Sequence, residues 1–364
     1  MFHFSPVYWY VLLCVLFFGH MAETHSPIVI RRDGSIWRKP SLFPAFILSL
    51  VLILVAGFRY YVGTDFGTYF QRDVPSWSQV FYNVVHFKEG GFSFLTKIAN
   101  LWGHNGQNLI FLCSFITVGV YCRTIYKFSF MYLSAILLYL FIGEWQGSFN
   151  AIRQYIAAAI LFAGHRFILQ RRLRKYVVVV LFAALFHKTA IIMLIPYYVL
   201  TKKPNHAQLV RLAIAAIAIR FSYGFVFDAV EELKGADLAT EEDPYLYNSV
   251  NPLRILVAFI PVGIYTLMCP KVFFTREQVF YINACLFHSF TMLAAAGSCY
   301  LARVGSYTSA MTIIGFGTLF QMIEKKRNRQ ATMLIVLALY LFYWLYSLHI
   351  VSGGNFQFNF DVGF

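Results

Sequence analysis

The stretch PAFILSLVLILVAGFRYY, residues 44–61, decides the fold class of this chain. Its apolar part, together with the residues just before it, has the length and composition of a helix in a bilayer core. Arg59 comes soon after this run and is followed directly by two tyrosines. A permanent charge at the edge of a membrane span is costly, so its position there indicates a function.

The composition of the whole chain agrees with that interpretation. Of its 364 residues, 59% are hydrophobic and only 13% are charged, whereas a soluble domain carries about a quarter charged residues. The aromatic fraction of 19% fits lipid-facing Phe and interfacial Tyr side chains. The chain is therefore predicted to be an all-α, polytopic membrane protein.

Apolar runs of helix length predict about twelve membrane spans. Two of these runs are short and favour two short spans or a re-entrant pair, with His187 and Lys188 at the break between them. The runs lie near residues 6–21, 41–58, 106–122, 129–143, 150–168, 175–186, 189–200, 208–227, 251–269, 277–296, 300–322 and 331–349.

The formal net charge of +14 comes mostly from basic residues in short loops between the apolar runs. The positive-inside rule places these loops on the cytoplasmic side, and no nucleic-acid partner is needed to explain them. The chain is then expected to form one integral membrane domain, residues 1–364, with outer loops at 59–105 and 228–250. The first loop contains two weakly amphipathic pieces, which are expected to lie along the membrane interface or across a cavity.

Four basic residues fall on the outer side against this charge bias: Arg59, Arg153, His187 and Arg303. Each one alone fits an ordinary anchor or a polar residue at a helix end. Gathered around one outward cavity, they would bind a phosphate or pyrophosphate, helped by the partial positive charge of helix N-termini. Asp65 is a general base for a sugar hydroxyl, a salt-bridge partner of Arg59 or a helix N-cap, and the sequence leaves these three open.

Several classes of site are absent from the sequence. It contains no Walker A motif and no Gly-rich fingerprint after a strand, which argues against a soluble nucleotide-linked donor. Its six cysteines are scattered, without CxxC or metal-type His/Cys spacing. We therefore expect a lipid-linked phosphate substrate reached from the bilayer, with no metal and no cofactor.

Taken in order, several segments resemble the EpsG family of Wzy-like polysaccharide polymerases. An R-x-x-x-GTD-x-x-x-Y pattern, an N-x-x-RQ helix start and an H-x-[ST]-A…P-Y segment are jointly specific for that family. The chain departs from it at EGGF, where the family often has an acidic residue, Pro, Gly and Tyr, and in its Phe-rich tail NFQFNFDVGF. The matching pieces are FRYYVGTDFGTYF (58–70), EGGFSFLTKIANLWG (89–103), FNAIRQYIAAAILFAG (149–164), LFHKTAIIMLIPYY (185–198) and ARVGSYTSAM (302–311).

The resemblance implies a C-type glycosyltransferase-like fold and an enzyme of O-antigen or exopolysaccharide synthesis, which includes lipopolysaccharide biosynthesis. Such an enzyme sits in the bacterial inner (cytoplasmic) membrane with its active site facing the periplasm or outside. It moves a growing glycan from undecaprenyl pyrophosphate onto a new undecaprenyl-pyrophosphate-linked repeat unit. Fixed arginines could replace a metal in this transfer, and direct attack opposite the leaving group would invert the anomeric configuration, so we expect a metal-independent, inverting reaction. A chain-length-regulating co-polymerase is the implied protein partner.

The resemblance also implies roles for individual residues. His187 and Asp65 would activate or orient the acceptor hydroxyl. Pyrophosphate and substrate binding would fall to Arg59, Tyr69, Arg153, Gln154 and Arg303.

Three other functions are compatible with parts of this pattern. A flippase or transporter for the same lipid-linked sugar needs basic residues in a cavity, but it should show repeat symmetry and charges through the membrane depth. An O-antigen ligase uses similar arginine and histidine chemistry with a different acceptor. A membrane acyltransferase would need a catalytic His near the cytoplasmic side, whereas the predicted topology puts His187 outside.

Overall fold

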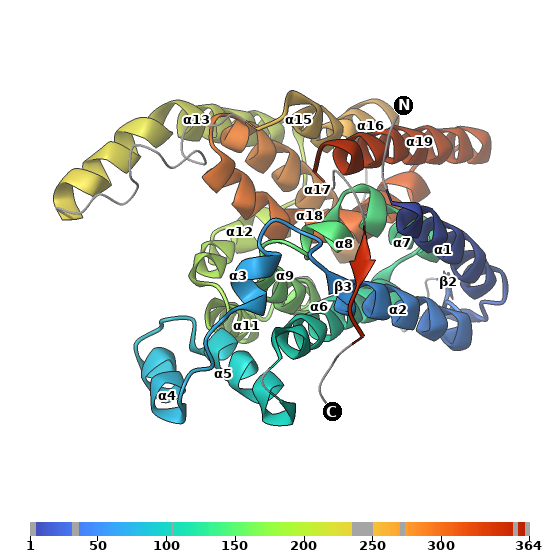
Figure 1. Cartoon of the computed structure of the whole chain (residues 1–364). Helices are drawn as coiled ribbons and strands as arrows, with labels where there is room; N and C mark the ends of the chain where they lie inside the picture. Colours follow the sequence, from blue (N-terminus) through green and yellow to red (C-terminus); the bar gives the residue numbers. More distant parts are fainter. Residues whose placement is uncertain are drawn as a thin grey trace. The chain divides into compact units, whose positions relative to one another are not determined.

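The computed structural model describes residues 5–30, 36–103, 105–234, 250–269, 274–351 and 356–360. In these residues the chain is mostly helical, with two short antiparallel strand pairs (Figure 1). The chain divides into two compact units. The first comprises Met1–Ile195 and Leu334–Phe364, and the second comprises Pro196–Met333.

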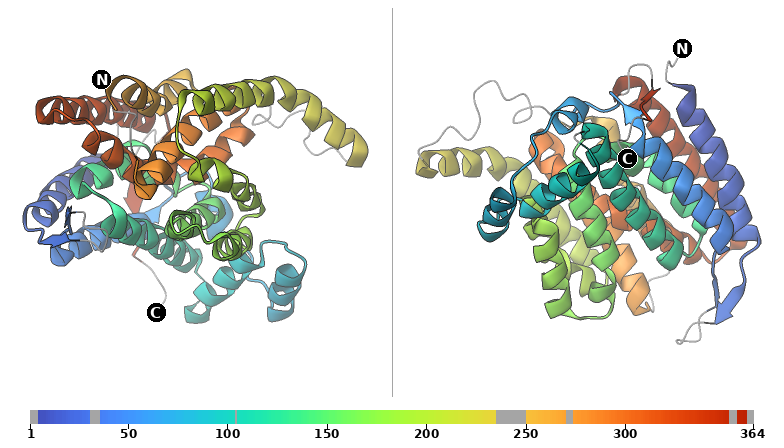
Figure 2. Two further views of the ribbon diagram at one scale, coloured as in Figure 1. Left: turned by 180° about the vertical axis from the view of Figure 1, so that it is seen from behind. Right: turned by 60° about the horizontal axis from the view of Figure 1, so that its bottom comes forward.

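The first unit is built around α6, which packs against α2, α9, α3, α5 and α7. Helix α1 lies beside α2, as both views of Figure 2 show, and also contacts α7. Its elements are α1 Pro6–Thr24, β1 Ile28–Ile30, β2 Ile36–Arg38, α2 Leu42–Gly57, β3 Arg59–Tyr60, α3 Phe66–Phe70, α4 Trp77–Val85, α5 Gly90–Ala99, η1 Asn100–Trp102, α6 Gly106–Phe128, α7 Tyr132–Phe141, α8 Glu144–Gly147, α9 Ile152–Gly164, α10 Arg166–Leu169, α11 Leu173–Ala184, η2 Lys188–Leu194 and β4 Gln357–Phe358.

Two hydrogen bonds inside this apolar bundle hold the short helix α8 in place. The Tyr121 hydroxyl donates to Glu144 Oε2 at 2.8 Å, and the Trp145 indole N–H donates to the Leu52 carbonyl at 3.3 Å. Such bonds are needed because an unpaired polar group in an apolar interior costs several kcal/mol. They fix the α7–α9 connection against α2 and α6, and so fix where α9 begins.

The C-terminal segment returns to the stretch that opened the sequence analysis. β4 pairs antiparallel with β3, so that Phe358 lies opposite Arg59. The Asn359 amide donates to the Phe58 carbonyl at 2.8 Å, and the rings of Phe58 and Phe360 lie 5.1 Å apart. Residues 356–360 of the Phe-rich tail therefore cover the C-terminal end of α2.

The second unit is organised around α17, which packs against α12, α13, α15, α16 and α18. A buried amide pair stabilises it, because Gln208 Nε2 donates to Asn283 Oδ1 at 2.8 Å. The final helix, α19, begins in this unit and ends in the first. The elements are α12 Pro196–Thr201, α13 His206–Lys234, α15 Pro252–Ala258, α16 Ile260–Met268, α17 Arg276–Ala294, η3 Ala295–Gly297, α18 Cys299–Gln321 and α19 Lys326–Val351.

The helices have the character of a membrane protein. In the described residues, five are long and apolar enough to cross a bilayer: Pro6–Thr24, Gly106–Phe128, His206–Gly224, Arg276–Gly297 and Lys326–His349. Four shorter apolar helices are Leu42–Gly57, Tyr132–Phe141, Lys188–Thr201 and Pro252–Met268. Each of the twelve predicted runs coincides with helical structure, so the helical class is confirmed. The number of spans near twelve stays a prediction, as does the single membrane domain.

The predicted break in the 175–200 region is confirmed. Helix α11 ends at Ala184, and the chain resumes as the 3-10 helix η2. The Tyr176 hydroxyl donates to the Met193 carbonyl at 2.9 Å, so η2 folds back along α11. A continuous helix is thereby excluded, and the break presents His187 at a turn.

The structure differs from the sequence expectation in two details. The β1–β2 and β3–β4 pairs were not predicted, because each strand is only two or three residues long and carries no period-two pattern. Helix α13 continues to Lys234, beyond the predicted helix end at 227. The rest of the predicted acidic loop, 235–249, lies outside the described residues.

Candidate active site

The turn between α4 and α5 brings a carboxylate to the break at His187. Glu89 ends this turn with a left-handed backbone, φ 55°, and precedes two glycines. A Cβ at Gly90 would lie 2.4 Å from the Val84 nitrogen, so the tight hairpin requires glycine there. The Gly91 amide donates to the Leu185 carbonyl at 2.9 Å. The sequence Glu-Gly-Gly therefore attaches the hairpin to the end of α11, two residues before His187.

His187 is oriented by the end of α11. Its backbone amide still donates to Ala183 at 3.1 Å, whereas its own φ of −151° and ψ of 117° are extended. This change of direction turns the imidazole toward the hairpin. The His187 Nδ1 atom lies 2.8 Å from Glu89 Oε1, and 21% of the histidine side chain is exposed.

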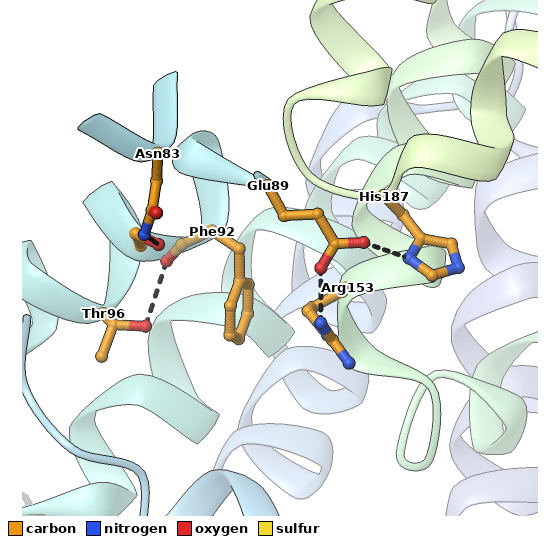
Figure 3. Close-up of polar contacts among 7 residues, drawn as sticks. Asn83, Glu89, Phe92, Thr96, Arg153 and His187 are labelled. Carbon is orange, nitrogen blue, oxygen red and sulfur yellow. Dashed lines mark hydrogen bonds and ion pairs between the residues drawn. The ribbon is translucent and has the colours of Figure 1, made fainter. Parts of the chain in front are cut away.

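Arg153 approaches the same carboxylate from the first turn of α9. Its Nη1 donates to Glu89 Oε2, so that the two carboxylate oxygens are used by two different partners. Figure 3 shows Glu89 between Arg153 and His187, with the far ring nitrogen of His187 directed away from the carboxylate. The Arg153 side chain is 38% exposed and that of Glu89 is 15% exposed. The three residues form an open, water-accessible triad, called the Glu89 triad below.

The charge of Glu89 determines which ring nitrogen of His187 carries the proton. Burial raises the pKa of Glu89, but the hydrogen bond from His187 and the charge of Arg153 outweigh it and lower the pKa to about 2. An ionised carboxylate only accepts hydrogen bonds, so Nδ1 of His187 must carry the proton. The lone pair of a neutral imidazole is then on Nε2, which has no hydrogen-bond partner among the described residues.

Tyr69 and Arg72 extend the triad along α3 and the residues that follow it. Burial raises the pKa of the Tyr69 hydroxyl, and its hydrogen bond to Arg153 offsets part of this effect. Burial also lowers the pKa of Arg72, and the like charge of Arg153 lowers it further. The Arg72 guanidinium lies 5.0 Å from the ring centroid of Phe92. Two guanidinium groups therefore lie near Glu89, and the carboxylate of Asp73 also acts on Arg72.

Arg59 has a different environment. It is fully buried, and its Nη1 donates to Ser114 Oγ at 2.8 Å and to the Ala56 carbonyl. Its Nη2 donates to the Phe149 carbonyl at 3.3 Å, and the guanidinium lies 4.7 Å from the Phe149 ring centroid. Burial lowers the pKa of Arg59 to about 9, which leaves it charged at neutral pH. In the structure Arg59 joins α2 and α6 to the segment before α9; its predicted contact with a pyrophosphate stays a prediction.

Asp65 stands at the N-cap position of α3, but its side chain does not cap the helix. Its carboxylate accepts from the Thr64 hydroxyl at 3.2 Å. The salt bridge to Arg59 that the sequence left open is not formed, because the described partners of that guanidinium are Ala56, Ser114 and Phe149. The charge of Asp65 contributes to the raised pKa of Tyr69. Asp65 therefore lies near the residue through which α3 contacts Arg153.

Two predicted site residues remain, Gln154 and Arg303. Gln154 is buried in α9 next to Arg153. Arg303 belongs to the second unit, where it is exposed in α18 and its carbonyl accepts from Ser306 Oγ at 2.7 Å. Of the four basic residues expected to converge, the structure joins Arg153 and His187 through one carboxylate. The roles of Gln154 and Arg303 stay predictions.

Glu89 and Arg72 are the residues that the sequence analysis missed. The signal for Glu89 was its position between two amphipathic pieces, directly before two glycines, in a segment otherwise short of acids. Arg72 offered no comparable signal, since an arginine in a polar loop is ordinary. Among the described residues, no group of three or more His, Cys, Asp or Glu is placed to hold a metal ion.

Chemically, the cluster pairs a base with fixed cations. A neutral imidazole whose Nδ1–H is held by a carboxylate can take a proton at Nε2, and the carboxylate stabilises the imidazolium that results. Guanidinium groups beside it can stabilise an anionic leaving group.

The comparisons with known proteins identify a family. The sequence model of the EpsG family matches residues 42–360, which is most of the chain. No curated protein and no solved structure matches the sequence of this chain.

Proposed function

The chain belongs to the EpsG family, and on that premise we propose that it is a membrane-embedded polysaccharide polymerase, a glycosyltransferase of exopolysaccharide or O-antigen type. The observation that carries this proposal is the Glu89 triad, in which one carboxylate holds both His187 and Arg153. A base and a cation fixed by the same group are what a glycosyl transfer from a phosphate leaving group requires.

The proposed donor is a glycan linked to undecaprenyl pyrophosphate, and the proposed acceptor is the non-reducing sugar of a new lipid-linked repeat. The acceptor hydroxyl oxygen forms a bond to the anomeric carbon of the donor, and the bond between that carbon and the pyrophosphate oxygen breaks. The hydroxyl proton passes to His187 Nε2, and the electron pair leaves with the pyrophosphate. Direct displacement of this kind inverts the anomeric configuration.

Each member of the cluster has a part in this step. His187 is the general base, and a positioned base of this kind contributes roughly a hundredfold or more. Glu89 holds the correct tautomer and stabilises the imidazolium, because its carboxylate is ionised. Arg153 and Arg72 meet the negative charge that develops on the pyrophosphate. Fixed cations can supply this stabilisation, so we propose a metal-independent reaction.

This assignment favours His187 over Asp65 as the base. Asp65 has no described cationic or carboxylate partner that would tune it, whereas His187 is oriented by a full ion-pair network. We retain Arg303 as a ligand of the second lipid-linked substrate, with Tyr69 and Gln154 near the donor. Arg59 contributes indirectly, because it fixes the segment from which α9 and Arg153 start.

The surroundings of the enzyme are part of the proposal. About twelve spans hold the chain in the bacterial inner membrane, with the Glu89 triad facing the periplasm or outside. A chain-length-regulating co-polymerase is the proposed protein partner. The support for these points is the family match and the apolar helices.

A flippase and an O-antigen ligase remain as alternative functions. The Glu89 triad argues against the flippase but not against the ligase. A flippase for the same lipid needs cations, but it has no use for an imidazole whose Nδ1–H is held by a carboxylate and whose Nε2 is directed away from that carboxylate. An O-antigen ligase would use the same base and cations with a different acceptor. The test must therefore distinguish polymerisation from ligation.

The test replaces His187 and Arg153 by Ala, one at a time, in an otherwise intact producing strain. Surface polysaccharide is resolved on gels, and the amount of the membrane protein is measured in parallel. The expected result is loss of long chains while a single repeat unit still reaches the surface. The matched control is His86→Ala, since His86 is exposed on the same hairpin, its Nδ1 lies 2.9 Å from the Tyr82 carbonyl, and its ring stacks on that of Tyr82.

Two outcomes would overturn the proposal. A normal ladder in both variants at normal protein levels would show that the triad takes no part in polymerisation. Loss of the single repeat unit as well would place the protein upstream or at the ligation step.

A further inference from the structure

Helix α4 presents an apolar stripe that its own hairpin does not cover. Trp77, Phe81, Val84 and Val85 follow a spacing of i, i+4, i+7 and i+8, which places them on one face of the helix. They are 52%, 71%, 38% and 53% exposed. We call these residues the α4 stripe. An exposed cluster of this size marks an interaction surface in a folded protein.

The side of α4 that flanks the stripe at Val80, and the side that carries Asn83, are used for folding. Val80 is buried, and Asn83 Nδ2 donates to Ser93 Oγ at 3.0 Å, so this side packs on α5 (Figure 3). A complete capping box at Ser76 and Gln79 starts the helix. The hairpin is therefore a fixed element, and the stripe is not the result of an unfolded segment.

The length of α4 restricts what can cover the stripe. Nine residues give about 13 Å of helix at 1.5 Å per residue, whereas a bilayer core is about 30 Å thick. The helix is too short to cross a membrane, but it can lie along one with its apolar face down.

The residues around the stripe match a headgroup region. The Lys97 ammonium lies 5.8 Å from the Trp77 ring centroid, and the Lys88 ammonium lies 5.1 Å from that of Tyr82. Phe94 on α5 is 45% exposed, and the centroids of the Phe94 and Trp77 rings lie 6.3 Å apart. Tryptophan, tyrosine and lysine together are the residues that anchor protein segments at a membrane surface.

We propose that the α4–α5 hairpin docks through the α4 stripe onto the surface of the bilayer that holds the rest of the chain. The side chains of the α4 stripe insert at the boundary between headgroups and acyl chains. Lys88 and Lys97 bind the lipid phosphates. The occupant is the lipid, because the patch combines a short amphipathic helix with aromatic and cationic anchors.

Docking has a consequence for the active site, which rests on the proposed function. Glu89 lies at the turn of this hairpin, and the Gly91 amide ties the turn to Leu185, next to His187. The position of the hairpin on the bilayer therefore sets the depth of the Glu89 triad. That depth is where the pyrophosphate of a lipid-linked substrate emerges from the membrane.

The test uses the full-length protein in lipid nanodiscs, without substrate. Cys14 and Cys299, the two cysteines that are not buried, are replaced by Ser. A fluorescent NBD label is then attached through Phe81→Cys. The matched control is a label at Gln79→Cys, which lies on the other side of the same helix at about 100° per residue.

Two quenchers report the position of each label. Lipids that carry a nitroxide in the acyl chain should quench the label at 81 several-fold more than the label at 79, and aqueous iodide should show the reverse order. Adding Phe81→Asp to a protein labelled through Val85→Cys should abolish the lipid quenching at 85, whereas Phe81→Leu should preserve it.

Three results would overturn the proposal. Equal iodide quenching at 81 and 79 would show a free surface. Strong lipid quenching at both positions would show a helix sunk in the bilayer. Protection of position 81 from both quenchers would show a protein or glycan cover. The quenching measurements do not require enzymatic turnover. A failure of the docking proposal can therefore be distinguished from a failure of the proposed polymerase function.

Discussion

Glu89→Gln tests the chemistry of the active site most directly. The substitution keeps the size of the side chain and one acceptor oxygen, but it removes the negative charge that lies between His187 and Arg153. Gln can also present its amide N–H₂ to His187 Nδ1, which favours the wrong tautomer. The variant should therefore fold and still lose most of its activity.

The size of the effect follows from the charge network. A pKa of Glu89 lowered from 4.5 to about 2 corresponds to about 3 kcal/mol, at about 1.4 kcal/mol for each pH unit. Because 15% of the Glu89 side chain is exposed, solvent screening reduces this to about 2 kcal/mol. Only the part of this interaction that strengthens when the imidazolium forms affects the rate, so about 2 kcal/mol sets an upper limit of about 30-fold on the loss of rate.

The assay is the initial rate of chain elongation by membranes that contain the variant, with a lipid-linked repeat unit as substrate. Protein amount is matched by quantitative immunoblot. Glu324→Gln serves as the control, since Glu324 is an exposed acid before α19 whose loss should leave the rate unchanged.

One result would refute this reasoning. If Glu89→Gln elongates chains at the normal rate with normal protein level, Glu89 neither holds the tautomer nor stabilises the imidazolium. In that case the triad is an ordinary surface ion pair, and such pairs contribute little.

Three further results are expected. Because the pKa of Glu89 is lowered on folding, its stabilising effect is present above about pH 4.5 and is lost as the pH falls toward 2; thermal unfolding should show wild type and Glu89→Gln converging in acid, and a constant gap at all pH values would contradict this. Arg59→Lys should destabilise the protein by about 3 kcal/mol, since a lysine lacks the fork that reaches both Ser114 and Phe149; an unchanged Tm would show that these bonds are dispensable. Gly90→Ala should lower activity with little change in total helix content, because its Cβ would meet the Val84 nitrogen at 2.4 Å and shift the turn that holds Glu89; circular dichroism checks the fold, and full activity would mean that the turn adjusts freely.

The helical class could be predicted because apolar runs are a local property. Each predicted run coincides with helical structure, and the interruption before Lys188 was visible as two runs too short to span a bilayer. The strand pair between Arg59 and Phe358 could not be foreseen in the same way. It joins residues almost a whole chain length apart, and neither strand is long enough to show a pattern.

The structure brings His187 and Arg153 together at one carboxylate, and their roles in the reaction stay predictions. Both residues contact Glu89, which the sequence analysis did not identify as a site residue because it considered only basic residues on the outer side and Asp65. Arg59 and Arg153 looked alike in sequence, as arginines at the edge of an apolar run. In the structure one is enclosed by Ser114 and backbone carbonyls, whereas the other is 38% exposed.

The sequence by itself determined that this chain is a helical membrane protein with cationic and imidazole groups at helix ends, because hydropathy and charge bias act residue by residue. Only the tertiary structure decided which of these groups meet. Glu89 reaches His187 and Arg153 because a Gly-Gly hairpin packs on the end of α11, next to the start of α9. Contacts between residues separated by 64 and 98 positions depend on how helices pack, and no local pattern encodes them.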